Sequence, residues 1–187
     1  TKGRFLMDKR NRENFDSAEA NFNKALSIDP NYALAYAGLA DCYTINQKGL
    51  SQVEAIPIAR EYARKALSLD SNLSEALATM SFIQVVFDHN WKEAKKTLEK
   101  ALALNPNYPL AHIFYGNLLQ YSGENTSRGL SEIKKALSLD PLSSAYSWVL
   151  GRNYYYSGKY DSAHLQLKKT LILEPNSASA KGFIALT

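Results

Sequence analysis

The 187-residue sequence predicts an all-α fold, an α-solenoid of stacked antiparallel helix pairs. A phrase of the type Lys-Ala-Leu-Ser-Leu-Asp-Pro recurs five times, with intervals of 41, 35, 35 and 34 residues between copies. A small residue precedes each copy by a constant interval. Two registers with the same offsets indicate a structural repeat. The copies begin at Lys24, Lys65, Lys100, Lys135 and Lys169, and the small residues are Ala18, Ala59, Ala94, Gly129 and Ala163.

Each copy has the pattern of one helix face. An apolar residue lies between the two small residues in every copy, as Leu98 and Ile133 show, and small-apolar-small spacing places all three on one side of a helix. Pro closes four of the five phrases and ends the helix. A second periodic stretch lies upstream, separated by turn residues such as Ser157-Gly158-Lys159. Each unit is therefore predicted to be helix, tight turn, helix.

The pattern resembles the tetratricopeptide repeat, whose unit has 34 residues. The unit 144–177 matches best, with the aromatic, glycine, alanine and proline positions in place; it departs at Thr170, where the family has Ala. The resemblance implies a right-handed superhelix. The matching residues are Leu150, Gly151, Tyr154, Gly158, Tyr160, Ala163 and Pro175.

The repeats divide the whole chain, 1–187, into one predicted solenoid. The predicted units are a partial repeat 1–32, full repeats 33–73, 74–108, 109–143 and 144–177, and the start of a further repeat at 178–187.

The first full repeat is too long. Ser51 followed by Glu54 is a capping-box signature, so its second helix is predicted to begin near Gln52. Pro57 then falls inside this helix, where we expect a kink.

Three phrases also resemble the repeat regions of bacterial multidomain signalling proteins. They begin at Asp29, Asp88 and Asp140, and they accompany the lengthened first full repeat. In that group the repeats follow an adenylate cyclase, a protein kinase or a winged-helix DNA-binding module. The chain also has no initial Met. We therefore expect it to be a fragment of a longer protein.

Composition narrows the class of protein. The net charge is +4 and the charges are interspersed, so no block of like charge marks a nucleic-acid tail. The single cysteine, Cys42, cannot form an internal disulfide. No apolar run is long enough to span a bilayer, and charged residues interrupt the N-terminus where a signal peptide would be apolar. The cytoplasm is the default location.

No arrangement of residues indicates catalysis, and we expect the chain not to be an enzyme. The three histidines have no metal-ligand spacing, and no nucleophile or phosphate-binding motif occurs, so no cofactor or metal is expected. His112 occupies a helix position where packing is favoured over ligand binding. Nucleic-acid binding is also not expected, because repeat positions show no code and the recurring lysines are better explained as partners of helix C-termini.

The resemblance implies a concave groove, lined by the first helix of each repeat, that takes a peptide or a partner's helix. The family's groove positions change in character along the chain and become aromatic and polar in the last two full repeats. Inter-helix packing is the alternative role for these aromatic residues. The candidate groove residues there are Ile113, Asn117, Gln120, Tyr121, Trp148, Arg152, Tyr155 and Tyr156; earlier ones are Asp41, Thr44, Ile45, Ala78, Phe82, Val85 and Val86.

Three functions remain open. The leading prediction is a protein-protein interaction scaffold that binds a peptide or helix in this groove. The second is a regulatory or sensing region that acts within a bacterial signalling enzyme or transcription regulator. The third is self-association through the uncapped C-terminal helix, where Phe183, Ile184 and Leu186 are expected to be exposed.

Overall fold

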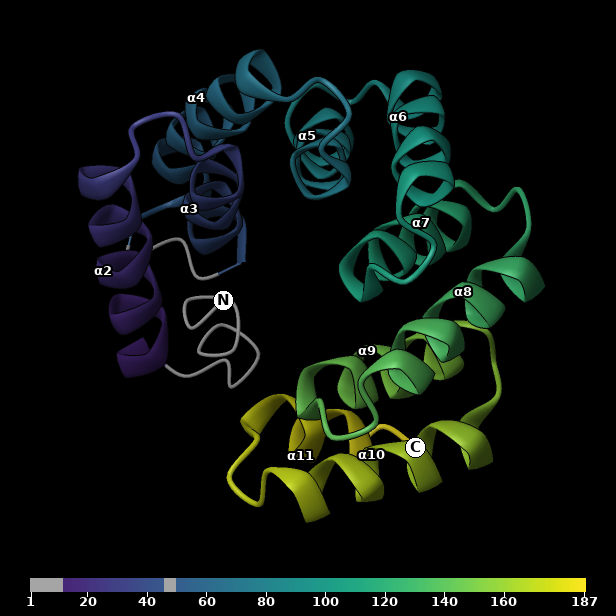
Figure 1. The fold of residues 1–187 in the computed structure, drawn as a ribbon. Helices are drawn as coiled ribbons and strands as arrows, with labels where there is room; N and C mark the ends of the chain where they lie inside the picture. Colours follow the sequence, from purple (N-terminus) through teal and green to yellow (C-terminus); the bar gives the residue numbers. More distant parts are fainter. Residues whose placement is uncertain (1–11, 46–49) are drawn as a thin grey trace. The chain divides into compact units, whose positions relative to one another are not determined.

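The computed structural model describes residues 12–45 and 50–187, and all regular structure in these ranges is helical (Figure 1). The predicted all-α class is confirmed. The partial first helix expected within residues 1–11 lies outside the described residues. The helices are α2 (Arg12–Ile28), α3 (Ala33–Ile45), α4 (Gln52–Leu69), α5 (Ser74–Val86), α6 (Trp91–Leu104), α7 (Pro109–Ser122), α8 (Thr126–Leu139), α9 (Ser144–Tyr156), α10 (Tyr160–Leu173) and α11 (Ala178–Ile184).

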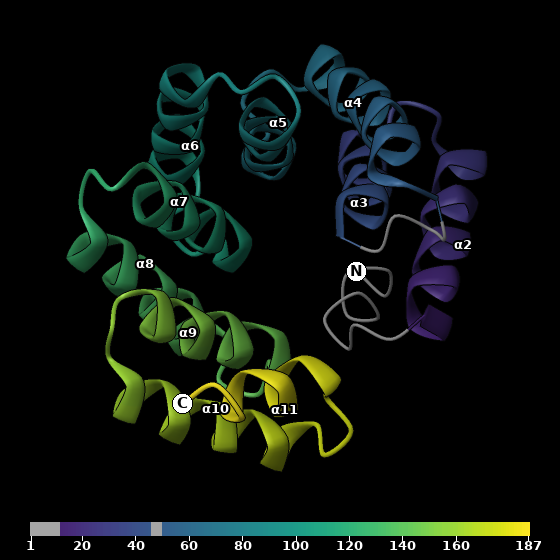
Figure 2. The same cartoon turned by 180° about the vertical axis from the view of Figure 1, so that it is seen from behind.

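The chain forms two compact units, Thr1–Pro106 and Asn107–Thr187. In the first unit, α3 pairs with α4 and α5 with α6, while α2 packs on α3. In the second unit, α7 pairs with α8 and α9 with α10, and α11 contacts both α9 and α10. Both views of the second unit show α8 and α10 beside their partners α7 and α9 (Figure 2). Each full repeat therefore supplies one antiparallel helix pair.

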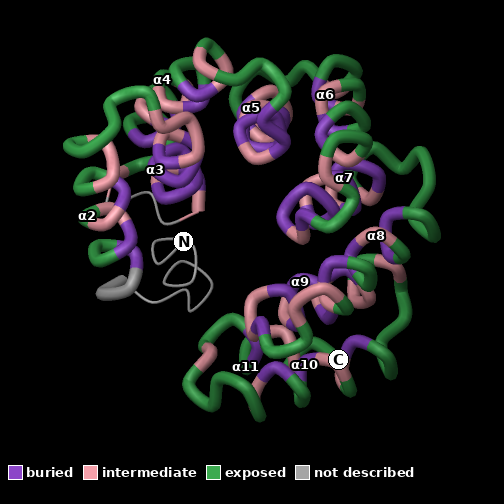
Figure 3. Tube along the Cα trace, in the orientation of Figure 1, coloured by how far each residue is buried: buried purple, intermediate pink, exposed green. Residues whose placement is uncertain are grey.

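The recurring small and apolar residues form the contacts between helices. Ala59, Ala94 and Ala163 are fully buried, as are Leu98 and Ile133 between the small positions. Within each unit, burial is concentrated on the helix sides that face neighbouring helices, and the turns are exposed (Figure 3). The periodicity read from the sequence is thus the periodicity of the core.

Two helix pairs depend on a glycine in the first helix. A Cβ at Gly116 would lie 2.5 Å from Ile133 Cγ1 and 2.7 Å from the Gly129 carbonyl oxygen. A Cβ at Gly151 would lie 2.8 Å from Leu167 Cδ2. These distances are too short for any side chain, so both pairs approach as closely as glycine allows.

The tight turns inside the last two repeats also use glycine. Gly123 has a φ of 69° and Gly158 a φ of 70°, which is the left-handed region. The turn between α5 and α6 has His89 there instead, with a φ of 52°. The predicted turn residues are therefore placed as expected.

Helix α4 begins at Gln52, as the capping signature predicts. The Glu54 carboxylate accepts hydrogen bonds from the Ser51 N–H at 2.9 Å and from the Ser51 hydroxyl at 2.7 Å. These bonds stabilise the charged form and lower the pKa of Glu54. Pro57 lies inside α4, and the kink expected there stays a prediction.

Candidate functional site

The candidate residues on α7 differ in exposure. Helix α7 begins at Pro109, whose fixed φ suits the first helical position. Ile113 is buried in the core, whereas Asn117 and Gln120 are half-buried and Tyr121 is 49% exposed. Ile113 therefore supports the face, and the other three side chains are available to form it.

The candidate residues on α9 are mostly half-buried. Trp148, Arg152 and Tyr155 are partly covered, and Tyr156 is 56% exposed. The N-terminus of α9 is capped by Ser143, whose hydroxyl oxygen accepts a hydrogen bond from the Tyr146 N–H at 3.2 Å. We call the seven residues Asn117, Gln120, Tyr121, Trp148, Arg152, Tyr155 and Tyr156 the α7/α9 face.

Hydrogen bonds join the two helices of this face. Arg152 Nη2 donates to Asn117 Oδ1 at 3.0 Å, and Asn153 Nδ2 donates to the same oxygen at 3.1 Å. One turn further along α7, Gln120 Nε2 donates to the Ser157 hydroxyl oxygen at 2.9 Å. Asn117 therefore accepts two hydrogen bonds and fixes the position of the Arg152 guanidinium.

Asn153 is a residue of the network that the sequence analysis missed. Its side chain is fully buried, and its Nδ2 also donates to the Val149 carbonyl oxygen at 2.8 Å. The repeats themselves contain a signal for this residue. The equivalent position holds Cys42, Ile83 and Leu118 in the other full repeats, all buried and apolar.

Four buried polar atoms around this network have no hydrogen-bond partner among the described residues. They are Gln120 Oε1, Trp148 Nε1, Arg152 Nε and Asn153 Oδ1. Native proteins leave few such groups unpaired, because each costs about 1–3 kcal/mol. Their concentration on one pair of helices makes this region the strongest candidate for a functional site.

Aromatic rings enclose Arg152. Its guanidinium carbon lies 4.8 Å from the centre of the Trp148 ring and 5.9 Å from that of Tyr121. Both distances fall within the range of cation–π attraction. The positive charge therefore contacts rings from two helices.

Helix α11 covers part of the α7/α9 face. The Phe183 ring meets Trp148, Tyr155 and Tyr156 edge to face, with centroid distances of 6.3, 5.5 and 6.0 Å. The expectation that Phe183 is exposed is therefore wrong, because it packs on these three rings and is half-buried. Ile184 is also half-buried, whereas Leu186 is 61% exposed.

The earlier candidate groove residues have a different environment in the first unit. Asp41 is buried, and the Thr79 hydroxyl donates a hydrogen bond to its carboxylate. Thr44 and Ala78 are buried as well. The others, Ile45, Phe82, Val85 and Val86, are half-buried. The carboxylate of Asp41 thus joins α3 to α5 within the core.

His112 and Glu132 form a hydrogen-bonded pair between α7 and α8. His112 Nδ1 lies 2.7 Å from Glu132 Oε2, and the histidine ring is buried. The hydrogen bond from His112 lowers the pKa of Glu132 below its ordinary value, and the nearby Arg128 lowers it further, against the opposing effect of burial. His112 therefore has a packing and pairing role.

The described ranges hold no group of three or more His, Cys, Asp or Glu side chains placed to bind a metal ion. Cys42 is buried in the core of the first unit. Within the same ranges, no helix is long and apolar enough to cross a membrane.

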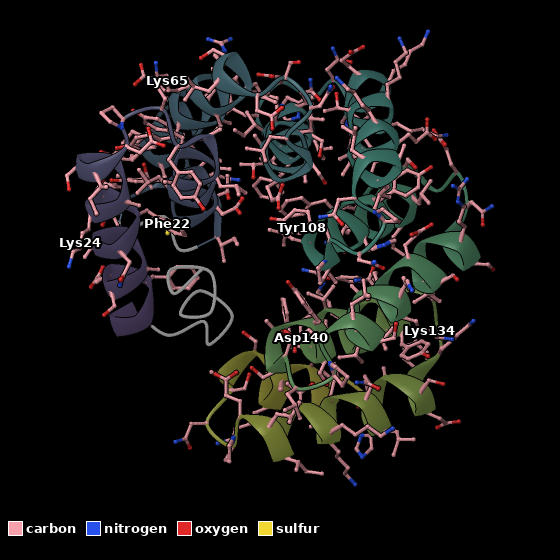
Figure 4. The ribbon with its side chains drawn as sticks, in the orientation of Figure 1. Phe22, Lys24, Lys65, Tyr108, Lys134 and Asp140 are labelled. Atoms are coloured by element: carbon pink, nitrogen blue, oxygen red, sulfur yellow. The ribbon has the colours of Figure 1, made fainter. Side chains whose placement is uncertain are left out.

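The recurring lysines lie on exposed helix surfaces. Figure 4 shows Lys24 on the side of α2 that faces away from α3. None of the five lies in the last turn of its own helix, so the expected pairing with that helix's C-terminus is wrong. Lys100 instead donates to the Ser71 carbonyl oxygen at 3.2 Å, in the turn that follows α4.

Paired helices, joined at recurring small residues, define a helical-repeat protein. The family model described as Tetratricopeptide repeat matches residues 9–32 of this chain. The structure is also similar to two solved proteins described as TPR proteins. TTC0263 of Thermus thermophilus has a TM-score of 0.71 and 19% identity, with 98% of this chain and 95% of that chain covered. YrrB has a TM-score of 0.57 and 24% identity, with 91% and 83% covered.

Two curated proteins are similar in sequence. Protein O-mannosyl-transferase TMTC3 of Homo sapiens is 26% identical over 179 residues, which is 94% of this chain and 19% of that protein. Transcriptional regulator HilA of Salmonella paratyphi A is 28% identical over 148 residues, which is 76% of this chain and 26% of that protein. The chain therefore spans about a quarter or less of the length of these relatives.

Proposed function

We propose that the chain is a protein-interaction module that binds an extended polypeptide segment or a helix of a partner on the α7/α9 face. The tetratricopeptide repeat fold implies protein partners. We choose this surface because four unpaired buried polar atoms lie beside exposed and half-buried aromatic side chains. Hydrogen-bonding groups and aromatic rings together are typical of binding hot spots.

The comparison with YrrB supports this function. That protein is described as having an unusual peptide-binding site, and its fold covers most of this chain. A scaffold role without catalytic activity is part of this proposal. The groove itself, as a shape, stays a prediction.

The test uses a displayed library of random 12-residue peptides selected on the full chain. The double variant Tyr121→Ala/Tyr156→Ala removes the two most exposed rings of the α7/α9 face. We expect it to weaken the selected peptides at least about tenfold, since exposed aromatic anchors dominate such interfaces. Leu165→Ala is the matched control, because Leu165 is 58% exposed on α10, outside this face. Equal binding by both variants would remove the α7/α9 face from consideration.

A regulatory role within a longer signalling protein is a second candidate. The similarity to a protein described as a transcriptional regulator, of which this chain covers 26%, favours it. A bacterial source and a cytoplasmic location belong to the same proposal. Sequencing the gene on both sides of the segment tests it. Flanking sequence without a catalytic or DNA-binding domain would contradict it.

Self-association is a third candidate. It has weaker support because Phe183 packs on rings of its own chain and is not exposed for pairing with a second copy. Leu186 is the large apolar side chain near the C-terminus that remains mainly exposed. Light scattering at increasing protein concentration tests it, and a monomer throughout would contradict it. If the chain is a monomer throughout, the Leu186→Ser variant will have the same measured mass as the unmodified chain.

A further inference from the structure

We infer that the α7/α9 face selects an acidic segment, and that the guanidinium of Arg152 binds an Asp or Glu side chain within that segment. This inference rests on the proposed function and names the chemistry of its partner. It depends on three observations, which concern the partners of Arg152, the charge of the helices around it and the atoms it still offers.

The first observation is a comparison of three arginines that stack on aromatic rings. Arg60 lies 5.5 Å from the ring of Phe87 and donates to both carboxylate oxygens of Asp88, at 3.0 and 2.6 Å. In the second unit, Arg128 lies 5.1 Å from the Tyr115 ring and 3.7 Å from Glu132 Oε1. Two of the three stacked guanidinium groups therefore have a carboxylate partner in the fold.

Arg152 has the rings but lacks the carboxylate. Its partners within the described ranges are Trp148, Tyr121 and the neutral amide oxygen of Asn117. The guanidinium is half-buried, and a partly desolvated cation gains most from an anionic partner. Because the fold supplies this partner twice elsewhere, its absence here points to a carboxylate that comes from another chain.

The second observation is the charge of the surrounding helices. Helices α7, α9 and α11 contain no Asp or Glu, and their cationic side chains are Arg152 and Lys181, apart from His112. The carboxylates of the second unit lie on α8, on α10 and in the turns. The α7/α9 face thus has a positive charge with no negative charge on its own helices, which favours acidic ligands.

The third observation concerns which guanidinium atoms are available. Nε is buried, and Nη2 uses one hydrogen on Asn117. Nη1 forms no hydrogen bond among the described residues and is not one of the buried unpaired atoms. A carboxylate can therefore approach the Nη1–Nη2 end, where two parallel N–H groups fit its two oxygens.

The position of Arg152 favours a side-chain carboxylate over the C-terminus of a partner. Trp148 lies one turn before it on α9, and Tyr155 and Tyr156 lie one turn after it. A segment that passes over Arg152 can use the aromatic residues on both sides. A chain that ended at Arg152 would leave one side of the face unused.

The experiment begins from the selected 12-residue peptides, resynthesised with an amidated C-terminus and assayed by fluorescence anisotropy. We expect Asp or Glu to be enriched at one position. Replacing that residue by Asn or Gln should weaken binding to the unmodified chain about tenfold or more. On Arg152→Gln the same replacement should change binding less than about twofold, because the cation that reads the carboxylate is gone. The difference should shrink with added NaCl.

Matched variants separate the site from general charge effects. Arg128→Gln removes another stacked arginine of the same unit and should leave the discrimination intact. Arg152→Lys keeps the charge but loses the planar fork, so it should retain only part of the discrimination. Circular dichroism of each variant establishes whether it is folded. If Arg152→Gln does not fold, Arg152→Lys still tests the inference.

The outcomes distinguish the inference from the function on which it rests. Peptides that bind through Tyr121 and Tyr156 with no acidic preference would overturn the inference and leave the function standing. Equal discrimination by Arg152→Gln would also overturn it. If a neutral peptide binds equally well through a free C-terminal carboxylate, the ligand of Arg152 is a peptide C-terminus and not an Asp or Glu side chain, and the inference is overturned. If no selected peptide depends on the α7/α9 face, the proposed function fails, and the inference with it.

Discussion

His112 and Glu132 join helices α7 and α8 through a contact of 2.7 Å between Nδ1 and Oε2. The pair lies at the edge of the core of the second unit, with the glutamate side chain only 19% exposed. The hydrogen bond lowers the pKa of Glu132, so the folded chain favours the charged carboxylate more than the unfolded chain does.

This pair makes the stability of the second unit depend on acid. Because the folded pKa is lowered, the contribution is complete above the unfolded pKa of Glu132, near 4.5, and is lost as the pH falls through the folded value. Glu132→Gln should reduce the free energy of unfolding at pH 7 by about 1–2 kcal/mol and should flatten its dependence on pH below about 4.5. Urea unfolding between pH 3 and 7 measures this. Glu61→Gln, an exposed site on α4, is the control; an equal effect there would contradict the assignment.

Gly116→Ala should destabilise the second unit by about 1–3 kcal/mol, because the new Cβ would overlap Ile133 and the Gly129 carbonyl oxygen. Gly182→Ala is the matched control. Gly182 lies in α11 with no atom within 4 Å of the position of a Cβ, so alanine should stabilise the helix by about 0.5–1 kcal/mol. Thermal unfolding followed by circular dichroism compares the two. A Gly116→Ala melting temperature equal to that of the unmodified chain would show that the helix pair can move apart without cost.

Gly158→Ala tests a different property of glycine. Space is available around Gly158, but its φ of 70° strains any residue with a side chain. We expect a loss of about 1–2 kcal/mol, whereas Gly158→Asn should lose less, since Asn tolerates the left-handed region. The free energies of unfolding in urea provide the comparison. Equal losses for both variants would mean that φ is not the cause.

Asn153→Leu should stabilise the chain by about 1 kcal/mol, because it removes the unpaired Oδ1 atom from the core. The reverse change at the equivalent position, Leu118→Asn, should destabilise it by more than about 2 kcal/mol. Asn153→Leu should also weaken peptide binding, since Asn117 would lose one of its two donors and hold Arg152 less firmly. Unfolding and anisotropy on the same samples measure both effects. A stabilised variant with unchanged binding would assign Asn153 no role in the site.

The repeat was readable from the sequence because its signals are local and occur five times. Alanine spacing, proline and turn glycines each report a backbone or packing requirement of one helix pair. Gln52 and Gly158 therefore lie where they were predicted. The role of Phe183 was not predictable in this way. Its burial depends on three aromatic rings of α9, which no periodicity relates to residue 183.

The candidate site was predictable in its residues but not in its interactions. Family positions placed Asn117 and Arg152 on first helices of adjacent repeats, but not the hydrogen bond between them, which depends on how α7 and α9 pack. The predicted pairing of the recurring lysines with the C-termini of their own helices was wrong for the same reason. Lys100, for example, donates to the Ser71 carbonyl oxygen, which belongs to the preceding helix pair. Comparison among the repeats would have found Asn153, because it is polar whereas the equivalent residues Cys42, Ile83 and Leu118 are apolar.

Trp148 contacts both the Arg152 guanidinium and the Phe183 ring, and its indole N–H has no hydrogen-bond partner among the described residues. Indole emission responds to nearby charge and to hydrogen bonding at this N–H. The chain contains one other tryptophan, Trp91, on α6. Trp91→Phe would therefore leave Trp148 as the single tryptophan of the chain, and a segment that occupies the α7/α9 face would be detected as a shift in tryptophan emission without any attached label.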